Sequence, residues 1–251
     1  MNRRAIRRSF DRAAASYDSA ATLQRRVCEL LLAELPEATP RTILDAGCGT
    51  GYALGLLRAR QPDASIIAMD FAPAMVAAAG GGVCADIEAL PFPPSRFDLY
   101  WSSLSFQWCN AHRAISEAAR VLAPGGILAV SSLGPGTLAE LSDAFAGIDG
   151  HRHVLDFPPV DSLPAACAAT GLTNVRMVRR PVRLHHATLA DLLGELRALG
   201  ANQVGAARRP GLMGRRAWQT VEQRYEARRE AAGLPATFEV ILCLASKPHT
   251  S

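Results

Sequence analysis

Lysine is almost absent from this 251-residue sequence, because Lys247 is the only lysine among its 27 basic residues. A Schiff-base mechanism needs an amine nucleophile, so it has almost no candidate residue here. No apolar run reaches the roughly 18 residues that a membrane-spanning helix requires. The Arg-rich residues 1–11 are followed by no apolar stretch of the kind found in secretory signals. We therefore expect a cytoplasmic protein without a membrane partner.

Paired cysteines are also lacking. The six cysteines show no C-x-x-C spacing and are scattered over the chain at Cys28, Cys48, Cys84, Cys109, Cys167 and Cys243. This pattern is typical of reduced thiols and not of a disulfide framework or a zinc site. We expect no bound metal.

The composition is that of a globular protein, with 49% apolar and 20% charged residues. Residues 3–35 carry apolar side chains at helical spacing and predict an N-terminal helical cap over 1–35. Short apolar runs then alternate with helical patterns, and these runs lie at 43–44, 65–69, 82–85, 97–102 and 126–131. The alternation predicts an α/β fold with a doubly wound, Rossmann-like sheet that binds ligands at the carboxyl ends of its strands.

Two later apolar runs, 175–184 and 238–245, predict an antiparallel pair at one edge of the sheet. The sheet is then seven-stranded and mostly parallel. Residues 188–232, between the two runs, are rich in Ala, Leu and Arg and interrupted by glycines, which predicts a helical lid insertion over the ligand end. We expect a single domain over 1–251, with a core of 42–187 and 236–248.

A glycine-rich turn follows the first apolar run, with Gly47, Gly49 and Gly51 at alternating positions. Glycines at this spacing let the backbone lie directly against a ligand. A dinucleotide fingerprint, G-x-G-x-x-G, needs a glycine at position 52, which is Tyr52 here. Asp45, just before the turn, would repel a pyrophosphate and attract a cation, directly or through water.

Two further carboxylates end the next two strands. Asp70 stands where an acidic residue accepts hydrogen bonds from ribose hydroxyls, and Asp86 is placed to accept one from an adenine amino group. Phe71, Met75 and Ile87 are apolar enough to enclose the adenine ring. Together these residues predict a site for an adenosine with a cationic tail.

Five segments in this order resemble the motifs of class I S-adenosylmethionine-dependent methyltransferases: residues 44–51, Asp70, Asp86 with Ile87, residues 97–103 and residues 122–126. The resemblance implies S-adenosylmethionine as cofactor, with Tyr17 covering it from the N-terminal cap. The cofactor-binding residues are then Tyr17, Asp45, Gly47, Cys48, Gly49, Gly51, Asp70, Phe71, Met75, Asp86, Ile87, Ser102 and Ser103.

The flanking segments resemble, more narrowly, the malonyl-acyl-carrier-protein O-methyltransferases of biotin synthesis. The similar segments lie at 9–24, 104–109, 136–141, 153–157 and 199–203. This resemblance implies methyl transfer to the free carboxylate of a malonyl thioester, carried by an acyl carrier protein or as malonyl-CoA. A carboxylate is ionised at pH 7 and needs no general base, and no His–Asp pair stands out as one. Catalysis would then be positioning, by Tyr17, Gln107 and Trp108.

Recognition of the substrate carboxylate leaves several residues open. Arg25 and Arg152 are candidate partners, and the favoured alternative for each is an ordinary solvated surface arginine. Neutral donors, namely Tyr17, Gln107, Trp108 and Asn202, would bind the carboxylate without lowering its nucleophilicity as a tight ion pair does. His153 is a candidate donor to the thioester or a turn-capping residue.

The modest net charge of +4 conceals an uneven distribution. Residues 3–12 hold five Arg and one Asp, which gives +4, and residues 176–229 hold twelve Arg and four acidic residues, which gives +8; the remainder is −8. A basic cap and insertion beside the substrate entrance would steer an acidic carrier protein. The candidate docking residues are Arg179, Arg180, Arg208, Arg209, Arg215 and Arg216, and the alternative is an ordinary solvated face.

Two other functions remain open at this point. One is a methyltransferase of a small molecule such as a quinone or organic acid, which needs no basic docking face. The other is a non-catalytic cofactor-binding or nucleic-acid-binding protein, favoured by the arginine content alone. Because no aromatic residues are interleaved with those arginines, we expect no nucleic-acid partner. The pattern leaves the oligomeric state undetermined.

Overall fold

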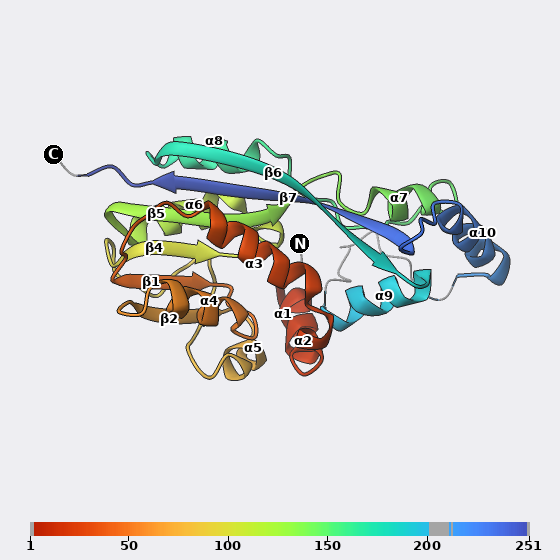
Figure 1. The fold of residues 1–251 in the computed structure, drawn as a ribbon, viewed down its shortest axis with the longest axis horizontal. Coiled ribbons are helices and arrows are strands. Elements are labelled where there is room, and N and C mark those ends of the chain that lie inside the picture. The colour runs from red at the N-terminus through yellow and green to blue at the C-terminus, as the bar shows by residue number, and fades with distance from the viewer. Residues whose placement is uncertain (1–2, 201–210, 212, 250–251) are drawn as a thin grey trace.

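A seven-stranded sheet organises the computed structural model, which describes residues 3–200, 211 and 213–249 (Figure 1). The strand order is β3-β2-β1-β4-β5-β7-β6. The strands are β1 (Thr42–Ala46), β2 (Ser65–Asp70), β3 (Val83–Cys84), β4 (Phe97–Ser102), β5 (Leu122–Leu133), β6 (Thr173–His186) and β7 (Leu234–Ser246). The first five pair in parallel, whereas β7 runs antiparallel to both β5 and β6. The expected α/β, Rossmann-like class is confirmed.

Helices cover both faces of the sheet because successive strand residues point to opposite sides. In β4, Leu99 and Trp101 belong to one apolar core and Tyr100 to the other. The first core includes residues of α3 (Thr22–Glu34), α4 (Tyr52–Arg60) and α10 (Arg215–Glu226). The second includes residues of α6 (Ala111–Val121) and α8 (Ser162–Ala169). The sheet is thus buried between two helical layers.

The N-terminal cap consists of α1 (Arg3–Ala13), α2 (Tyr17–Ala20) and α3. Helices α1 and α2 lie near the carboxyl ends of the parallel strands, whereas α3 packs on one face of the sheet (Figure 1). Helix α1 packs near α5 (Pro73–Ala78), and α2 packs near α9 (Leu189–Ala198). The short helix η1 (Phe106–Trp108) follows β4, and α7 (Ala139–Phe145) follows β5. Helices α1 and α2 therefore lie between the half of the sheet formed by β1, β2 and β3 (the β1–β3 half) and the helices that follow β6.

Strands β6 and β7 form a long antiparallel ladder from Thr173↔Ser246 to His186↔Leu234. Both are longer than the apolar runs that predicted them. In β6 the added length was hidden because it is an edge strand whose arginines and histidines are mostly exposed. Helices α9 and α10 lie beyond the far end of this ladder, within the expected 188–232 insertion (Figure 1). The limits of cap, core and insertion within a single domain remain predictions. No helix in the described part of the chain is long and apolar enough to span a membrane.

Candidate active site

Two adjoining cavities lie at the carboxyl end of the sheet. The smaller, of about 90 Å³, lies beside the glycine turn, and the larger, of about 540 Å³, lies between the cap and the segment that contains α9. Four residues line both: Phe10, Tyr17, Leu104 and Trp108. The two cavities therefore meet at these side chains, two of which, Tyr17 and Trp108, were predicted to position the reactants.

The glycine turn has the left-handed backbone that its sequence requires. Gly47 has φ +83° and Gly49 has φ +55°. A Cβ on Gly47 would overlap the Ser105 side chain, so a larger residue would displace the loop after β4. A Cβ on Gly49 would meet no atom closer than the Tyr17 ring at 3.9 Å, and its backbone faces the smaller cavity. The turn is thus open for close approach of a ligand.

Asp70 connects the glycine turn to the start of α5. Its Oδ2 accepts a hydrogen bond from Gly49 N at 3.0 Å, and its Oδ1 accepts one from Ala72 N at 2.8 Å. Burial raises the pKa of Asp70, and these hydrogen bonds act against that rise. Each carboxylate oxygen accepts more than one hydrogen bond, so Asp70 retains capacity for ribose hydroxyls.

Asp45 is a buried acid with an unmet hydrogen-bonding capacity. It is 1% exposed, and its Oδ2 has no partner among the described residues. Burial, with a smaller contribution from Asp70, raises the pKa of Asp45 to about 8. The side chain lies behind the cavity wall and does not line it. A cation in the smaller cavity would favour the ionised form of Asp45, so the site fits the positively charged S-adenosylmethionine.

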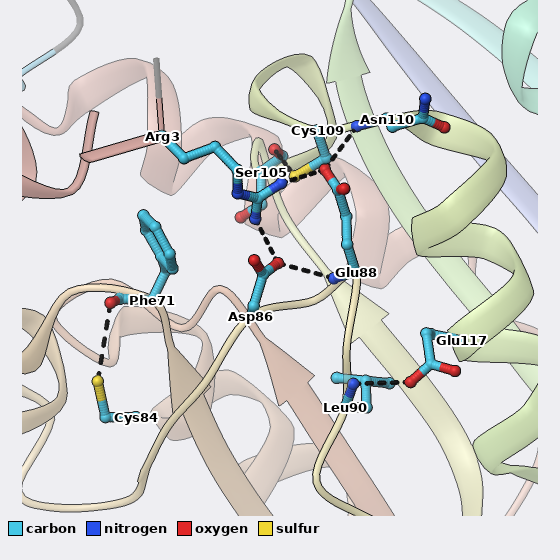
Figure 2. A network of polar contacts seen from close by, with 10 residues as sticks. All are labelled: Arg3, Phe71, Cys84, Asp86, Glu88, Leu90, Ser105, Cys109, Asn110 and Glu117. Atoms are coloured by element: carbon cyan, nitrogen blue, oxygen red, sulfur yellow. Dashed lines mark hydrogen bonds and ion pairs between the residues drawn. The ribbon is translucent and has the colours of Figure 1, made fainter. Parts of the chain in front are cut away.

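Arg3 of α1 lines the smaller cavity beside Asp86 and Phe71 (Figure 2). Its guanidinium forms ion pairs with Asp86 and Glu88 and lies 5.3 Å from the centre of the Phe71 ring. Asp86 Oδ1 also accepts a hydrogen bond from Glu88 N at 2.8 Å. From the sequence, Arg3 was expected only as part of a basic cap, since nothing in the spacing distinguishes it from the other arginines of that helix.

Two further polar contacts join the cap to the β1–β3 half of the sheet. Asp18 Oδ1 accepts a hydrogen bond from the Thr50 hydroxyl at 2.6 Å, in the middle of the glycine turn. Asp11 Oδ1 accepts one from Ala74 N at 3.2 Å, in the first turn of α5. With Arg3, these residues place α1 and α2 across the smaller cavity, and no spacing in the sequence marks them as contacts.

Most of the predicted cofactor residues gather in one place. The smaller cavity is lined by Tyr17, Gly47, Gly49, Asp70, Phe71, Met75, Asp86, Ile87 and Ser103. Cys48, Gly51 and Ser102 do not line it. The Ser102 hydroxyl donates to Ala46 O at 2.6 Å and so joins the ends of β4 and β1. This hydrogen bond supports the strand end from which the turn begins.

The larger cavity is mostly apolar and includes four of the predicted substrate residues, Gln107, Trp108, Arg152 and His153. Trp108 packs edge-on against Phe10, with ring centres 5.5 Å apart. Arg152 forms a partly exposed ion pair with Asp156 at 3.2 Å.

Two of the predicted substrate residues are not found there. Arg25 lines neither cavity: it donates to Asp18 O at 2.9 Å and lies over the Tyr52 ring. Asn202 lies outside the described residues.

A His–Asp pair does occur at the larger cavity, contrary to expectation. His153 Nε2 lies 2.9 Å from Asp149 Oδ1, and the imidazole stacks on Phe145 at 3.9 Å between ring centres. The irregular turn after α7 brings these two residues together, and no helical or strand spacing signals such a turn. All six cysteines are free thiols, and no cluster of metal-ligating side chains occurs in the parts that the structure describes.

Comparisons with known proteins agree with this architecture. Residues 44–130 match a family model described as a methyltransferase domain. The chain is 44% identical over 245 residues to the malonyl-acyl-carrier-protein O-methyltransferase of Dechloromonas aromatica (strain RCB), covering 96% of this chain and 94% of that protein. The chain belongs to the malonyl-acyl-carrier-protein O-methyltransferase family.

Two further matches concern the sequence and the fold, respectively. The biotin biosynthesis bifunctional protein BioHC of Cellvibrio japonicus (strain Ueda107) is 40% identical over 257 residues, covering 99% of this chain and 51% of that protein. Phosphoethanolamine N-methyltransferase 2 of Haemonchus contortus, solved in complex with S-adenosyl-L-methionine, is 15% identical with a TM-score of 0.57, covering 95% of this chain and 57% of that one. The second match supports the fold.

The arginines predicted to dock a carrier protein in this family member differ in their surroundings. Arg179 forms an ion pair with Glu239, and Arg180 forms one with Glu34 at 3.4 Å, both on the edge strand β6. Arg215 and Arg216, in the first turn of α10, are exposed and have no ion-pair partner in the described residues. Arg208 and Arg209 lie outside those residues.

Proposed function

We propose that this protein transfers the methyl group of S-adenosylmethionine to the free carboxylate of malonyl-acyl carrier protein. The product is the malonyl methyl ester that primes pimeloyl synthesis for biotin. The observation that carries the proposal is the pair of cavities that meet at Tyr17 and Trp108, one with the features of a cationic nucleoside site and one apolar and of ligand size. Family membership favours a malonyl substrate over a quinone or an unrelated organic acid.

The chain offers a distinct contact for each part of the cofactor. Asp70 would accept the ribose hydroxyls, while Phe71, Met75 and Ile87 would enclose the adenine ring beside Asp86. The charge on Asp45, behind the wall, would favour the cationic end. When bound, S-adenosylmethionine supplies a methyl group activated by its positively charged sulfur.

Tyr17 holds its proton under working conditions. Burial raises the pKa of its hydroxyl, and the neighbouring charge of Asp70 raises it further. Tyr17 therefore acts as a neutral hydrogen-bond donor at the junction of the two cavities. A neutral donor orients the substrate carboxylate while leaving its oxygen nucleophilic, whereas a tight ion pair would reduce that nucleophilicity.

Water exclusion is the second contribution of the chain. Phe10 and Trp108 pack edge-on where the cavities meet, and Leu104 completes that wall. A carboxylate that enters this junction exchanges water for a few fixed donors, which favours attack on the activated methyl group. Because the carboxylate is already ionised, the His153–Asp149 pair is not required as a base.

The decisive assay compares malonyl-carrier, malonyl-CoA and free malonate as methyl acceptors, with the product identified by mass spectrometry. We expect the methyl ester on the carrier-bound malonyl group at the highest kcat/KM. Formation of no ester on any malonyl donor would refute the proposed function. Cytoplasmic location stays a prediction.

Carrier docking belongs to the same proposal. In the sequence, Arg215 and Arg216 stand between Met213 and Trp218, which line the larger cavity, so their charges lie close to that cavity. They have no acidic ion-pair partner among the described residues, whereas Arg179 does. Their positive charge complements the acidic surface typical of carrier proteins and would mainly accelerate association.

Charge reversal tests this docking surface. The double change Arg215→Glu and Arg216→Glu should raise KM for malonyl-carrier roughly tenfold, with a steeper effect at low salt. It should leave the small thioester malonyl-N-acetylcysteamine unaffected. Arg179→Glu is the matched control, and it should change the KM for malonyl-carrier and the KM for malonyl-N-acetylcysteamine by no more than about twofold. An equal loss on both substrates for the double variant would contradict docking at this surface.

A further inference from the structure

Two buried amide oxygens in the larger cavity lack hydrogen-bond donors. They are Oε1 of Gln24, in the first turn of α3, and Oε1 of Gln107, in η1, and neither has a partner among the described residues. Both side chains line the larger cavity, and the Gln107 residue is 5% exposed. Buried polar atoms in folded proteins are almost always paired, so two unpaired acceptors in one cavity point to a ligand that donates.

The orientation of the Gln107 amide is fixed by its surroundings. Its Nε2 donates to Leu104 O at 2.7 Å. Exchanging Nε2 and Oε1 would place two acceptor oxygens at that distance, which is unfavourable. Gln107 therefore presents an acceptor as its unpaired atom, which differs from the donor role toward the carboxylate expected from the sequence.

The chemistry of the unpaired atoms restricts what they bind. The carboxylate and the thioester carbonyl of a malonyl group only accept hydrogen bonds, so neither pairs with an amide oxygen. The arm of a carrier-bound thioester does contain donors, because amide N–H groups follow the sulfur after a two-carbon spacer. We propose that Gln24 and Gln107 form a subsite that accepts hydrogen bonds from the amide N–H groups of the thioester arm.

This subsite would set how far the substrate enters. Gln107 precedes Trp108 in the chain, and Gln24 follows Leu23, another wall residue of the cavity. An arm held by its amide at these residues would direct the acyl end toward the junction at Tyr17 and Trp108. Gln24 and Gln107 are then positioning residues that favour amide-containing thioesters. The inference rests on the proposed function, because it takes a malonyl thioester as the substrate.

The test changes one atom of the substrate. Malonyl-N-acetylcysteamine is compared with its ester isostere, malonyl-S-(2-acetoxyethyl) thioester, in which oxygen replaces the N–H group. We expect the wild-type protein to use the amide substrate with about tenfold higher kcat/KM, because the isostere leaves a buried acceptor unpaired. The double variant Gln24→Met and Gln107→Met should use both substrates with kcat/KM values within about twofold of each other.

Controls separate this role from a structural one. Gln223→Met, an exposed change on α10, should keep the tenfold preference. Equal kcat/KM values for the two thioesters in the wild-type protein would overturn the subsite, and they would indicate that water satisfies both oxygens. An undiminished preference in the double variant would overturn it as well. The wild-type comparison does not depend on how the variants fold. Absence of methyl ester from both thioesters would instead count against the proposed function.

Discussion

Replacing Asp45 by Asn should stabilise the ligand-free protein and weaken its hold on the cofactor. The pKa of Asp45 is raised from 3.8 to about 8 by burial and by the charge of Asp70. The folded state therefore binds this proton more tightly than the unfolded state does. The resulting stability is present below pH ~4 and is lost as the pH rises through 8. The amide that replaces the carboxyl group has no titratable proton, so the variant lacks this loss.

The size of the effect follows from the shift. Each unit is equivalent to ~1.4 kcal/mol, so a rise of roughly four units sets an upper limit of ~6 kcal/mol at alkaline pH. Relaxation and water entry reduce such values, and the new amide needs partners of its own, so we expect about 2 kcal/mol. For a chain of this size that difference raises the melting temperature by roughly 4–8 °C.

Calorimetry at several pH values between 5 and 9, with and without S-adenosylmethionine, measures both effects. The melting temperature of the ligand-free wild type should fall relative to Asp45→Asn as the pH rises. The affinity of the variant for S-adenosylmethionine, by titration calorimetry, should be at least tenfold weaker because the buried negative charge is gone. Asp63→Asn, an exposed change in the turn before β2, is the matched control and should alter neither quantity.

Two results would refute this reasoning. Parallel pH dependences of the melting temperature for the wild type and Asp45→Asn would mean that the pKa of Asp45 is not raised in the folded protein. Undiminished affinity of the variant for the cofactor would mean that the carboxylate does not act on the bound cation.

The other predictions concern residues that touch the smaller cavity. Asp70→Ala removes the ribose acceptor and the anchor of the glycine turn, and should weaken S-adenosylmethionine binding roughly 100-fold by titration calorimetry; an unchanged affinity would contradict the ribose role. Arg3→Ala removes the ion pair with Asp86 and should weaken cofactor binding by less than about tenfold, because that ion pair is partly exposed. Arg3→Lys should restore the affinity for the cofactor, and a loss of affinity that lysine fails to restore would count against charge pairing. Tyr17→Phe should lower kcat about tenfold in steady-state kinetics and leave cofactor affinity unchanged, and an intact kcat would exclude a donor role.

The sheet and the cofactor cavity were predictable because their signals are local in the sequence. Asp70 and Asp86 each end a short apolar run, and the ends of neighbouring parallel strands meet at one edge. The glycine turn needs its residue type at fixed positions, so Gly47 and Gly49 identify it directly. From the sequence, Asp45 was predicted to attract a cationic ligand, although its burial and its unpaired oxygen are visible only in the structure.

The contacts between distant segments were not predictable in the same way. Arg3 meets Asp86 from a helix far away in the sequence, and nothing in a run of similar arginines marks one of them. Arg25 was chosen by residue type, but its position on α3 directs it to Asp18 and Tyr52. The His153 pair depends on an irregular turn. Such contacts depend on how the helices pack, which apolar spacing alone does not specify.

The adjacency of His186 and Leu234 has a consequence for how this family can diversify. These residues are ladder partners at the ends of β6 and β7, so residues 187–233 leave and rejoin the sheet at one point. The segment is nevertheless part of the core, because Val221 and Tyr225 of α10 are buried against the sheet. A different segment in its place would have to supply equivalent apolar side chains, and it could then reshape the larger cavity while the glycine turn stays unchanged. The acceptor side can therefore vary only together with this part of the core.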